Sequence, residues 1–406
     1  MRIKKTILYF LLIILLSVSF GGCQKAEEKP KVIRFGAAQP FTGNLAMEGD
    51  KHQKGYDLWA EETNKAGGIT VNGEKYLVEI VYYDYQSDTA TAVKLAEKLI
   101  TEDKVDFLLG PMGSGAAKAV SAVTEKYQIP MVAPSASSIE VFTDGYKFIF
   151  GIFTENATLA EPLTDLALSK GVKSIAIVSR NDLFPLSIAN ELITSCEKRG
   201  IEVNYFDQYA IGTTDFSAML IDVAKTSPDW LFMTGYAEDG LQFFRQVKEL
   251  GISTKMQSMV AGAAFREFVE GLGESSEYVT TACWWHEVVT YEGTDVFKTS
   301  KNFVDLFEKK YGFKPDYPHA GAAVSAVVLA QAIEKANSLD PIKVREALAT
   351  ETFETFFAPI KFSEIGIVDS YIPPVMQILD GKHLVLLPED IKQSEFVYPI
   401  PPWDER

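Results

Sequence analysis

The sequence predicts an α/β protein of two lobes, each a parallel β-sheet flanked by helices, with a hinge between them. From Val32 onward, short β-rich runs alternate with amphipathic helical stretches, which is the pattern of βαβ units. This alternation occurs in two successive series whose strands end in similar loops of small residues. A chain of 406 residues is also too long for one ordinary core and suits two lobes.

The first series contains four candidate strands, each ended by a Pro or Asp. They are VIRFGAAQP (32–40), YLVEIVYYD (76–84), VDFLLGP (105–111) and IPMVAP (129–134). Residues 115–127 between the last two predict a helix, because Ala116, Val120, Val123 and Tyr127 fall on one helical face. Runs that are apolar throughout indicate strands buried on both faces, as in a parallel sheet.

The second series repeats this arrangement. Its candidate strands are SIAIVS (174–179), VNYFDQY (203–209), DWLFMTG (229–235) and KMQSMVA (255–261), with helical stretches at 186–199 and 239–250. VDFLLGP and PDWLFMTG match in pattern, and each precedes a helix and another strand that reaches a small-residue loop. We interpret this as a weak internal repeat, that is, two lobes of the same topology.

The remainder of the chain is expected to complete both lobes. After the strand VTTACWW (279–285), helices near 295–311 and 321–336 would finish lobe 1, while IKFSEIG (360–366) and VMQILDGKHLVLL (375–387) would finish lobe 2. We therefore expect lobe 1 to comprise 32–151 plus 284–357. Lobe 2 would comprise 152–283 plus 358–406, including the C-terminal tail.

The N-terminus has the features of an export signal. A basic MRIKK precedes the apolar run ILYFLLIILLSV (7–18), which is shorter than the ~20 residues that span a bilayer. The run ends at FGGC, which resembles a bacterial lipobox with Cys23 as the lipidated residue; the alternative is an ordinary secretory signal with an incidental Cys. We expect a lipoprotein signal peptide at 1–22 and a tether at 23–31, hence a lipid-anchored extracytoplasmic protein.

Composition argues against several classes of function. The formal charge is −16, and removal of 1–22, with the three charges of Arg2, Lys4 and Lys5, leaves −19. Nucleic acid is an unsuitable partner for such a chain, because binding it requires a basic face. Two further cysteines without a C-x-x-C motif, and four histidines without metal-ligand spacing, give no support for a disulfide framework, a metal or a redox cofactor.

Two small polar loops follow neighbouring strands, GPMGSG (110–115) and APSASS (133–138). The first lacks the Lys and Ser/Thr of a phosphate-binding loop, and Ser114 lacks the glycines of a hydrolase nucleophile elbow, so catalysis is disfavoured. A site that binds a carboxylate requires fewer special residues than a catalytic site. A helix N-terminus at Ser114 favours an anion, and the Ser137 hydroxyl from the adjacent loop can donate to the same anion. The alternative is that Ser114 only caps a helix and that 135–138 only form a turn.

Four segments carry a resemblance to a known family: GAAQPFTGNLAMEGD, GPMGSGAAKAV, IPMVAPSAS and YPIPPWDER. They are similar to the type I periplasmic solute-binding proteins of branched-chain amino-acid ABC transporters, the Leu/Ile/Val-binding family. The resemblance implies two lobes joined by three crossovers that close on a ligand and dock on a permease. It also implies that Ser114 and Ser137 hold a ligand carboxylate, and that the 135–137 loop, with Ala136 and the Ser135 carbonyl, contacts the ligand and its ammonium.

The other wall departs from this family pattern. Where an acidic residue should face the ammonium, the chain has Ala261 or Gly262, and the first loop has Glu48 where an aromatic ring is common. Either Glu48 supplies the negative charge from the opposite lobe, or the ligand has no α-ammonium; a solvated Glu48 is a further alternative. Phe184 matches a ring position and Tyr236 matches one more loosely.

Three further residues near the cleft have open roles. At least one of Trp284 and Trp285 is expected to pack in the hinge. The other either packs there as well or stacks its ring on the ligand. His319 opens a helix and either faces the cleft or has no ligand role.

We therefore expect a binding protein without catalytic activity that delivers a small carboxylate solute, with an amino acid as first choice, to an ABC permease. The alternatives are an aromatic or other organic acid, an amide, a ligand-sensing receptor component of the same fold and, remotely, a serine hydrolase.

Overall fold

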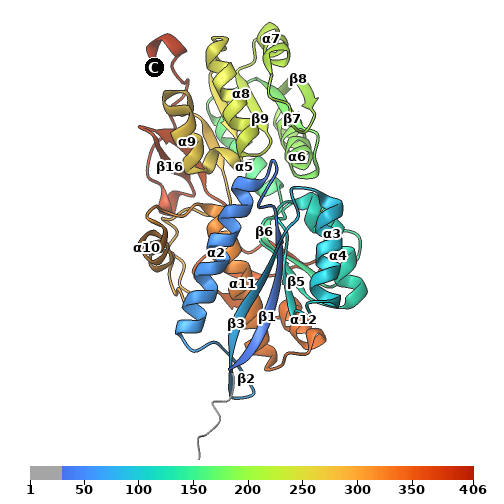
Figure 1. Ribbon diagram of the computed structural model, residues 1–406. Helices are drawn as coiled ribbons and strands as arrows, with labels where there is room; N and C mark the ends of the chain where they lie inside the picture. Colours follow the sequence, from blue (N-terminus) through green and yellow to red (C-terminus); the bar gives the residue numbers. More distant parts are fainter. Residues whose placement is uncertain (1–29) are drawn as a thin grey trace, which may run out of the picture. The chain divides into compact units, whose positions relative to one another are not determined.

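The computed structural model describes residues 30–406, so the predicted signal peptide, Cys23 and most of the tether lie outside the described residues. Two seven-stranded sheets organise the chain from Val32 onward, with a separate two-stranded sheet beside them. In Figure 1, helices α2, α3, α4 and α11 surround the first sheet, and α6, α7 and α8 surround the second. The predicted α/β class with two sheet-based lobes is confirmed.

The first sheet has the strand order β14-β6-β5-β4-β1-β3-β2. Its strands are β1 (Lys31–Gln39), β2 (Ile69–Val71), β3 (Glu74–Asp84), β4 (Phe107–Leu109), β5 (Met131–Ala133), β6 (Ile149–Thr154) and β14 (Ile367–Val368). Its helices are α2 (Ala46–Lys65), α3 (Thr89–Thr101), α4 (Ser114–Tyr127), α10 (Ser300–Tyr311), α11 (Tyr317–Ala336) and α12 (Pro341–Thr350).

The second sheet has the order β16-β15-β11-β10-β9-β7-β8. Its strands are β7 (Ser174–Arg180), β8 (Glu202–Tyr209), β9 (Trp230–Thr234), β10 (Met256–Met259), β11 (Thr280–Ala282), β15 (Val375–Leu379) and β16 (Lys382–Leu387). Its helices are α5 (Ala157–Ser169), α6 (Leu183–Arg199), α7 (Ser217–Thr226), α8 (Ala237–Glu249) and α9 (Arg266–Leu272).

The internal repeat is visible in the topology. The first five major strands of the first sheet run β3-β1-β4-β5-β6, and those of the second run β8-β7-β9-β10-β11, which is the same doubly wound order. The pairs β1–β4 and β7–β9 are parallel and form the point where the strand order reverses. Ligands of such sheets bind outside the carboxyl ends of the strands at that point.

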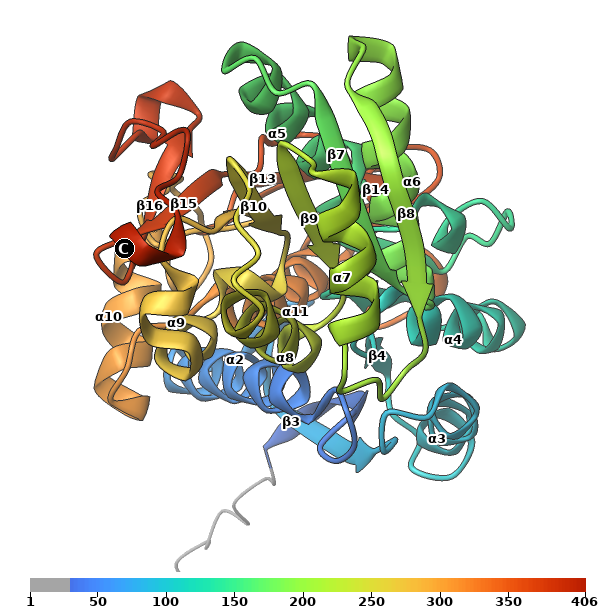
Figure 2. The same cartoon turned by 90° about the horizontal axis from the view of Figure 1, so that it is seen from above.

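The central strands are buried on both faces of their sheets because they are apolar throughout. β4 and β5 are buried at every residue, and their neighbours pack α2 and α11 on one side and α3 and α4 on the other. Figure 2 shows α7 and α8 on one side of the second sheet with α6 along the other. Each lobe is thus a three-layer structure whose strand-end loops remain outside the helical layers.

One expected strand differs. IKFSEIG was predicted to finish lobe 2, but Pro359–Lys361 forms β13 and pairs with β12 (Thr352–Glu354) in the two-stranded sheet. The chain then turns at Gly366, whose carbonyl accepts from the N–H of Gly151, and β14 joins β6 of the first sheet in parallel. The first sheet therefore includes residues from the stretch 358–406. β15 and β16 lie in the second sheet, as expected.

Candidate functional site

A small cavity lies between the strand-end loops of the two lobes. Its volume is about 20 Å³, which is room for about one water molecule. Both lobes contribute to its wall: Glu48, Met112, Gly113, Ser135, Ser137 and Phe153 from the first-sheet side, and Phe184, Tyr236, Ala261, Gly262, Phe265, Trp284 and Tyr317 from the second lobe, a crossover and the start of α11.

The GPMGSG and APSASS loops meet at this cavity. Gly110 and Ala133 lie so close that a side chain at 110 would come within 2.7 Å of the Ala133 Cα. Ser114 begins α4, is fully buried, and its Oγ accepts from the N–H groups of Ser137 and Ser138, both at 3.3 Å. Ser114 therefore joins the two loops to each other.

Ser137 presents the free hydroxyl of this wall. Its side chain is 1% exposed and lines the cavity, and its Oγ has no hydrogen-bond partner among the described residues. A buried hydroxyl without a partner costs roughly 1–3 kcal/mol. This cost would be removed by any ligand that accepts a hydrogen bond there.

Ser135 is held by a buried chain of polar groups. The Gln39 amide donates to the Gly110 carbonyl at 2.8 Å, which leaves its oxygen facing the Nδ1 of His52 at 2.9 Å. Burial lowers the pKa of His52 to about 3, so the ring is neutral and carries its proton on Nδ1. His52 Nε2 therefore accepts from the Ser135 hydroxyl at 2.6 Å. Ser135 Oγ keeps only lone pairs for a further partner.

Glu48 lies in the first turn of α2 and is 1% exposed. Its Oε1 accepts from the N–H of Ala237 at 3.3 Å, which is the first residue of α8 in the other lobe. Its Oε2 is buried without a partner in the described part of the chain. Burial raises the pKa of Glu48 to about 7, although the N–H groups of Glu48 and Ala237 and the charge of Lys51 oppose the rise.

Aromatic rings form most of the remaining wall. Centroids of successive rings lie 5.5–6.1 Å apart along the series Tyr236, Phe184, Trp284, Tyr317 and Phe265. Trp284 stacks on Phe153 at 4.4 Å and donates from Nε1 to the Thr154 carbonyl. This arc of rings offers apolar and π surface to a ligand.

The second-lobe loop after β10 has an unusual backbone. Ala261 adopts φ 59° and ψ −83°, a conformation that costs a residue with a Cβ of order 1–3 kcal/mol. At Gly262, a Cβ would lie 2.7 Å from Met259 Cε and 3.1 Å from Ala237 Cα. This loop brings backbone, rather than a long side chain, to the cavity.

The cavity brings together most of the predicted site residues. Glu48, Ser135, Ser137, Phe184, Tyr236 and Ala261 line it, whereas Ser114, Ala136 and His319 do not. His319 packs against the rings of Phe307 and Phe313, with its Nδ1 2.6 Å from Asp316 Oδ1. The ligand roles of all nine remain predictions.

Several lining residues had no prediction of their own. Met112 and Gly113 lie inside the GPMGSG loop that the sequence singled out, and Gly113 has φ 86° beside the Tyr236 hydroxyl. Phe153, Phe265 and Tyr317 had no such signal, because apolar residues at strand and helix ends read as core. Trp284 lines the cavity, while Trp285 stacks near Phe357 and donates to Ser300 Oγ.

An ion-pair cluster joins the lobes beside the cavity. Lys51, one turn after Glu48 on α2, contacts Asp316 at 2.6 Å and, across the lobes, Glu267 of α9 at 2.7 Å. Burial alone would lower the pKa of Lys51, but the charges of Asp316 and Glu267 outweigh it and the pKa is raised. Lys51 is therefore a buried cation at neutral pH, held by one carboxylate from each lobe.

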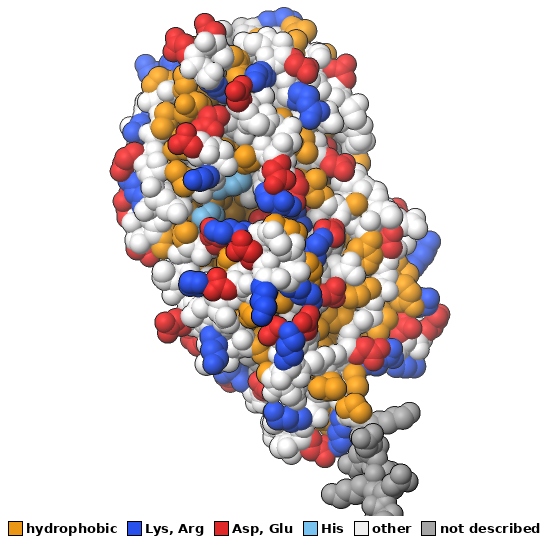
Figure 3. All heavy atoms as spheres, turned by 60° about the vertical axis from the view of Figure 1, so that its left-hand side comes forward, with side chains coloured by type: hydrophobic (Ala, Val, Ile, Leu, Met, Phe, Trp, Pro, Cys, Tyr) orange, Lys and Arg blue, Asp and Glu red, His pale blue; other side chains and the backbone are white. Residues whose placement is uncertain are grey.

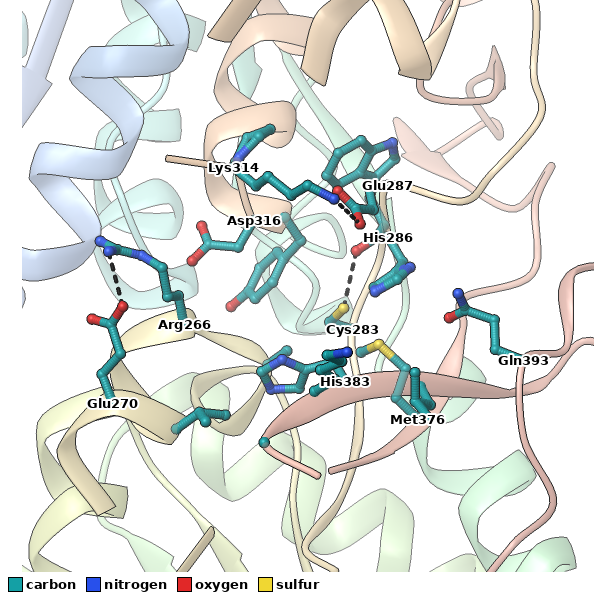
Figure 4. Close-up of a pocket in the computed structure, with 18 residues that line it drawn as sticks. Arg266, Glu270, Cys283, His286, Glu287, Lys314, Asp316, Met376, His383 and Gln393 are labelled. Atoms are coloured by element: carbon teal, nitrogen blue, oxygen red, sulfur yellow. Dashed lines mark hydrogen bonds and ion pairs between the residues drawn. The ribbon is translucent and has the colours of Figure 1, made fainter. Parts of the chain in front are cut away.

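A larger pocket of about 490 Å³ opens next to this cluster. Figure 3 shows histidine side chains in a hollow of the surface, and Figure 4 shows His286 and His383 facing the pocket. Four of its charged lining residues form two ion pairs, Arg266 with Glu270 and Lys314 with Glu287. Tyr317 lines both this pocket and the cavity, so the two are adjacent.

Comparison with known proteins identifies the family. A family model described as periplasmic binding protein matches residues 32–366. The chain belongs to the periplasmic binding protein family.

A Leu-, Ile-, Val-, Thr- and Ala-binding protein of Pseudomonas aeruginosa is 30% identical to this periplasmic binding protein over 86% of this chain and 91% of its own. The isoleucine-bound substrate-binding protein of a branched-chain amino-acid transporter from Streptococcus pneumoniae is 25% identical, with a TM-score of 0.78 over 91% of this chain and 100% of its own. A benzoate-bound solute-binding protein of an ABC transporter from R. palustris shares the fold, with 19% identity and a TM-score of 0.75 over 87% of this chain and 95% of its own.

These relatives are substrate-binding proteins, so this family member is a binding protein and not an enzyme, and it belongs outside the cytoplasm. Within residues 30–406, the helices are too short or too polar to cross a membrane. The same residues hold no cluster of three or more metal-ligating side chains.

Proposed function

We propose that this protein is a lipid-anchored receptor that captures one small carboxylate solute between its lobes and delivers it to the permease of an ABC importer. The observation that supports it most is the cavity itself. Loops of both lobes wall it at the point where the strand orders reverse, and it holds the unpartnered Ser137 hydroxyl. A hydroxyl beside the start of α4 suits a carboxylate, which helix N-termini favour.

The amino-acid relatives make an apolar or small amino acid the first choice of solute. A second candidate is an aromatic acid, since the arc of rings suits a flat ligand and a structural neighbour was solved with benzoate. The experiment is to denature the purified protein and identify the released small molecule by mass spectrometry. Its binding is then measured by calorimetry on refolded, ligand-free protein.

An amino acid or organic acid that binds without chemical change supports the proposal. Turnover of candidate esters or amides would contradict it and favour the hydrolase alternative. Permease genes beside this one would favour transport, and their absence would favour a sensing role.

Anchoring is tested separately. Lipidation at Cys23 predicts a diacylated mature N-terminus and partition into the detergent phase, both lost in Cys23→Ser. An N-terminus cleaved elsewhere would favour an ordinary secretory signal.

A further inference from the structure

The cavity contains a carboxylate, but not on the wall where the family resemblance places one. The two candidate positions in the second-lobe loop are Ala261 and Gly262, which both line the cavity, so this loop presents no acidic side chain there. Any ligand cation must be neutralised from elsewhere.

Glu48 of the first lobe supplies the unpaired negative group. One oxygen is occupied by the N–H of Ala237, and Oε2 is buried and lacks a partner among residues 30–406, while Glu48 itself lines the cavity. His52 lies four residues later on the same face of α2 and holds the Ser135 hydroxyl proton. Glu48 and Ser135 line the same cavity, and Glu48 Oε2 and Ser135 Oγ can only accept hydrogen bonds while Glu48 is ionised.

We infer that Glu48 and Ser135 bind the ammonium group of an α-amino acid whose carboxylate is held by Ser137, so that the first lobe grips both charged ends of the ligand. This assignment rests on the proposed function. The second lobe and the crossover then contribute the rings of Phe184, Tyr236 and Trp284, which cover the apolar side chain. The ligand class is an α-amino acid with an apolar side chain, rather than an amine-free acid.

The charges around Glu48 support this class. Lys51 lies on the same helix, but its ammonium is already paired with Asp316 and Glu267. From the packed elements, Glu238 of α8 adds a like charge, and the hydroxyls of Tyr85, Tyr236 and Tyr317 are neutral at pH 7 because burial raises the pKa of each. A ligand ammonium would supply the missing counter-charge, whereas a second carboxylate without an amine would face an anion.

The test compares amine-bearing and amine-free ligands of the same shape by calorimetry. The pairs are leucine with 4-methylpentanoate, and phenylalanine with 3-phenylpropanoate. We expect the amine-bearing member of at least one pair to bind, and its partner to bind at least tenfold more weakly. In Glu48→Gln, affinity for the amine-bearing ligand at pH 8 should fall tenfold to hundredfold, while the amine-free ligand binds as well or better.

Glu62→Gln is the matched control, since it makes the same change on α2 about 21 Å further along the helix. It should leave the discrimination unchanged, and unfolding curves of both variants confirm that they fold.

Proton linkage provides a second readout. The pKa of Glu48 is about 7 in the free protein, and an ammonium would lower it, so binding at pH 7 should release roughly half a proton. Affinity of the wild type should fall about tenfold from pH 8 to pH 6, and that of Glu48→Gln should not. Calorimetry in phosphate and in Tris measures the proton directly.

Proton uptake, or equal or tighter binding of the amine-free member, overturns the assignment but leaves the proposed function standing. Unchanged binding of leucine or phenylalanine by Glu48→Gln does the same. Binding of none of the four ligands overturns the assignment, while the proposed function falls only if the purified protein also releases and binds no small carboxylate solute.

Discussion

A single buried carboxyl at Glu48 lines the cavity and makes the stability of the ligand-free protein depend on pH. The group is almost fully buried, and its donor from the other lobe, the Ala237 N–H, is 3.3 Å away. Burial makes the ionised form of such a group less stable than the protonated form, so ionisation of Glu48 lowers the stability of the ligand-free protein. A ligand cation would compensate this loss. Function and stability are therefore opposed at this residue.

The first prediction is that Glu48→Gln stabilises the ligand-free protein at pH 8 but not at pH 4.5. Because folding raises the pKa of Glu48 from 4.5 to about 7, the folded state holds a proton that the unfolded state loses, and wild-type stability falls as pH rises across this window. Glu48→Gln has no carboxyl at this position, so its stability should not fall across this pH window. The difference should reach about 3 kcal/mol, at about 1.4 kcal/mol for each pKa unit.

Urea unfolding of both proteins at the two pH values measures the difference, with Glu62→Gln as control. A parallel pH dependence of wild type and Glu48→Gln would show that the carboxyl is solvated.

At the scale of elements, the loops after β4 and β5 divide two tasks between two serines. Ser114 holds the loops together by accepting two N–H groups, and the Ser137 hydroxyl has no hydrogen-bond partner among the described residues. We predict that Ser114→Ala lowers the unfolding free energy by about 1–3 kcal/mol, since two buried donors lose their acceptor. Ser137→Ala should raise the unfolding free energy of the ligand-free protein by up to about 1–3 kcal/mol, because it removes a buried hydroxyl without a partner, and should lower ligand affinity tenfold or more.

Denaturant unfolding and calorimetry on both variants separate these effects. If Ser137→Ala binds the co-purified ligand as tightly as wild type, the hydroxyl has no ligand role and the turn interpretation holds.

Helices α2 and α9 carry the second inter-lobe contact, Lys51 with Glu267. This pair exists only where the lobes meet, while Lys51 keeps Asp316 on its own lobe. Glu267→Gln should therefore weaken ligand binding roughly fivefold to thirtyfold, equivalent to about 1–2 kcal/mol taken from the closed form. Glu270→Gln is the matched control, because Glu270 pairs with Arg266 within the same helix. Equal affinities of the two variants in calorimetry would exclude a contribution of the cluster to closure.

The elements themselves were largely predictable from the sequence, for a physical reason. Strands such as FLL and MVA are apolar throughout, a pattern that indicates a sheet covered on both faces. The small polar residues that follow these strands indicated the loops of the candidate site. β14 was not predictable, since two residues carry no period, and its pairing with β6 depends on the turn at Gly366.

The lining rings were hidden because Phe153, Phe265 and Tyr317 look like core residues in a sequence. Likewise, the role of Ser114 depends on where one oxygen points, which no pattern records. Glu48 was recognisable only as a departure from the family, and the structure excludes only its solvated alternative, because the side chain is 1% exposed.

At the scale of the whole molecule, the narrow cavity predicts motion. A volume of about 20 Å³ does not admit an amino acid from outside, so the lobes must part for the ligand to enter and close over it afterwards. Small-angle scattering should show a smaller radius of gyration with saturating ligand than without. An unchanged profile would count against closure of two lobes on the ligand.

The late arrival of β14 also bears on the order in which the chain can acquire structure. The central strands of each sheet lie in one continuous stretch, β1 to β6 in the first and β7 to β11 in the second, but the first sheet is completed only by β14 and the second only by β15 and β16, all after residue 366. Each lobe can thus assemble its central sheet from local connections, while completion of both sheets is a long-range event and correspondingly slow. A nascent chain would keep both sheets unfinished until almost its entire length was available.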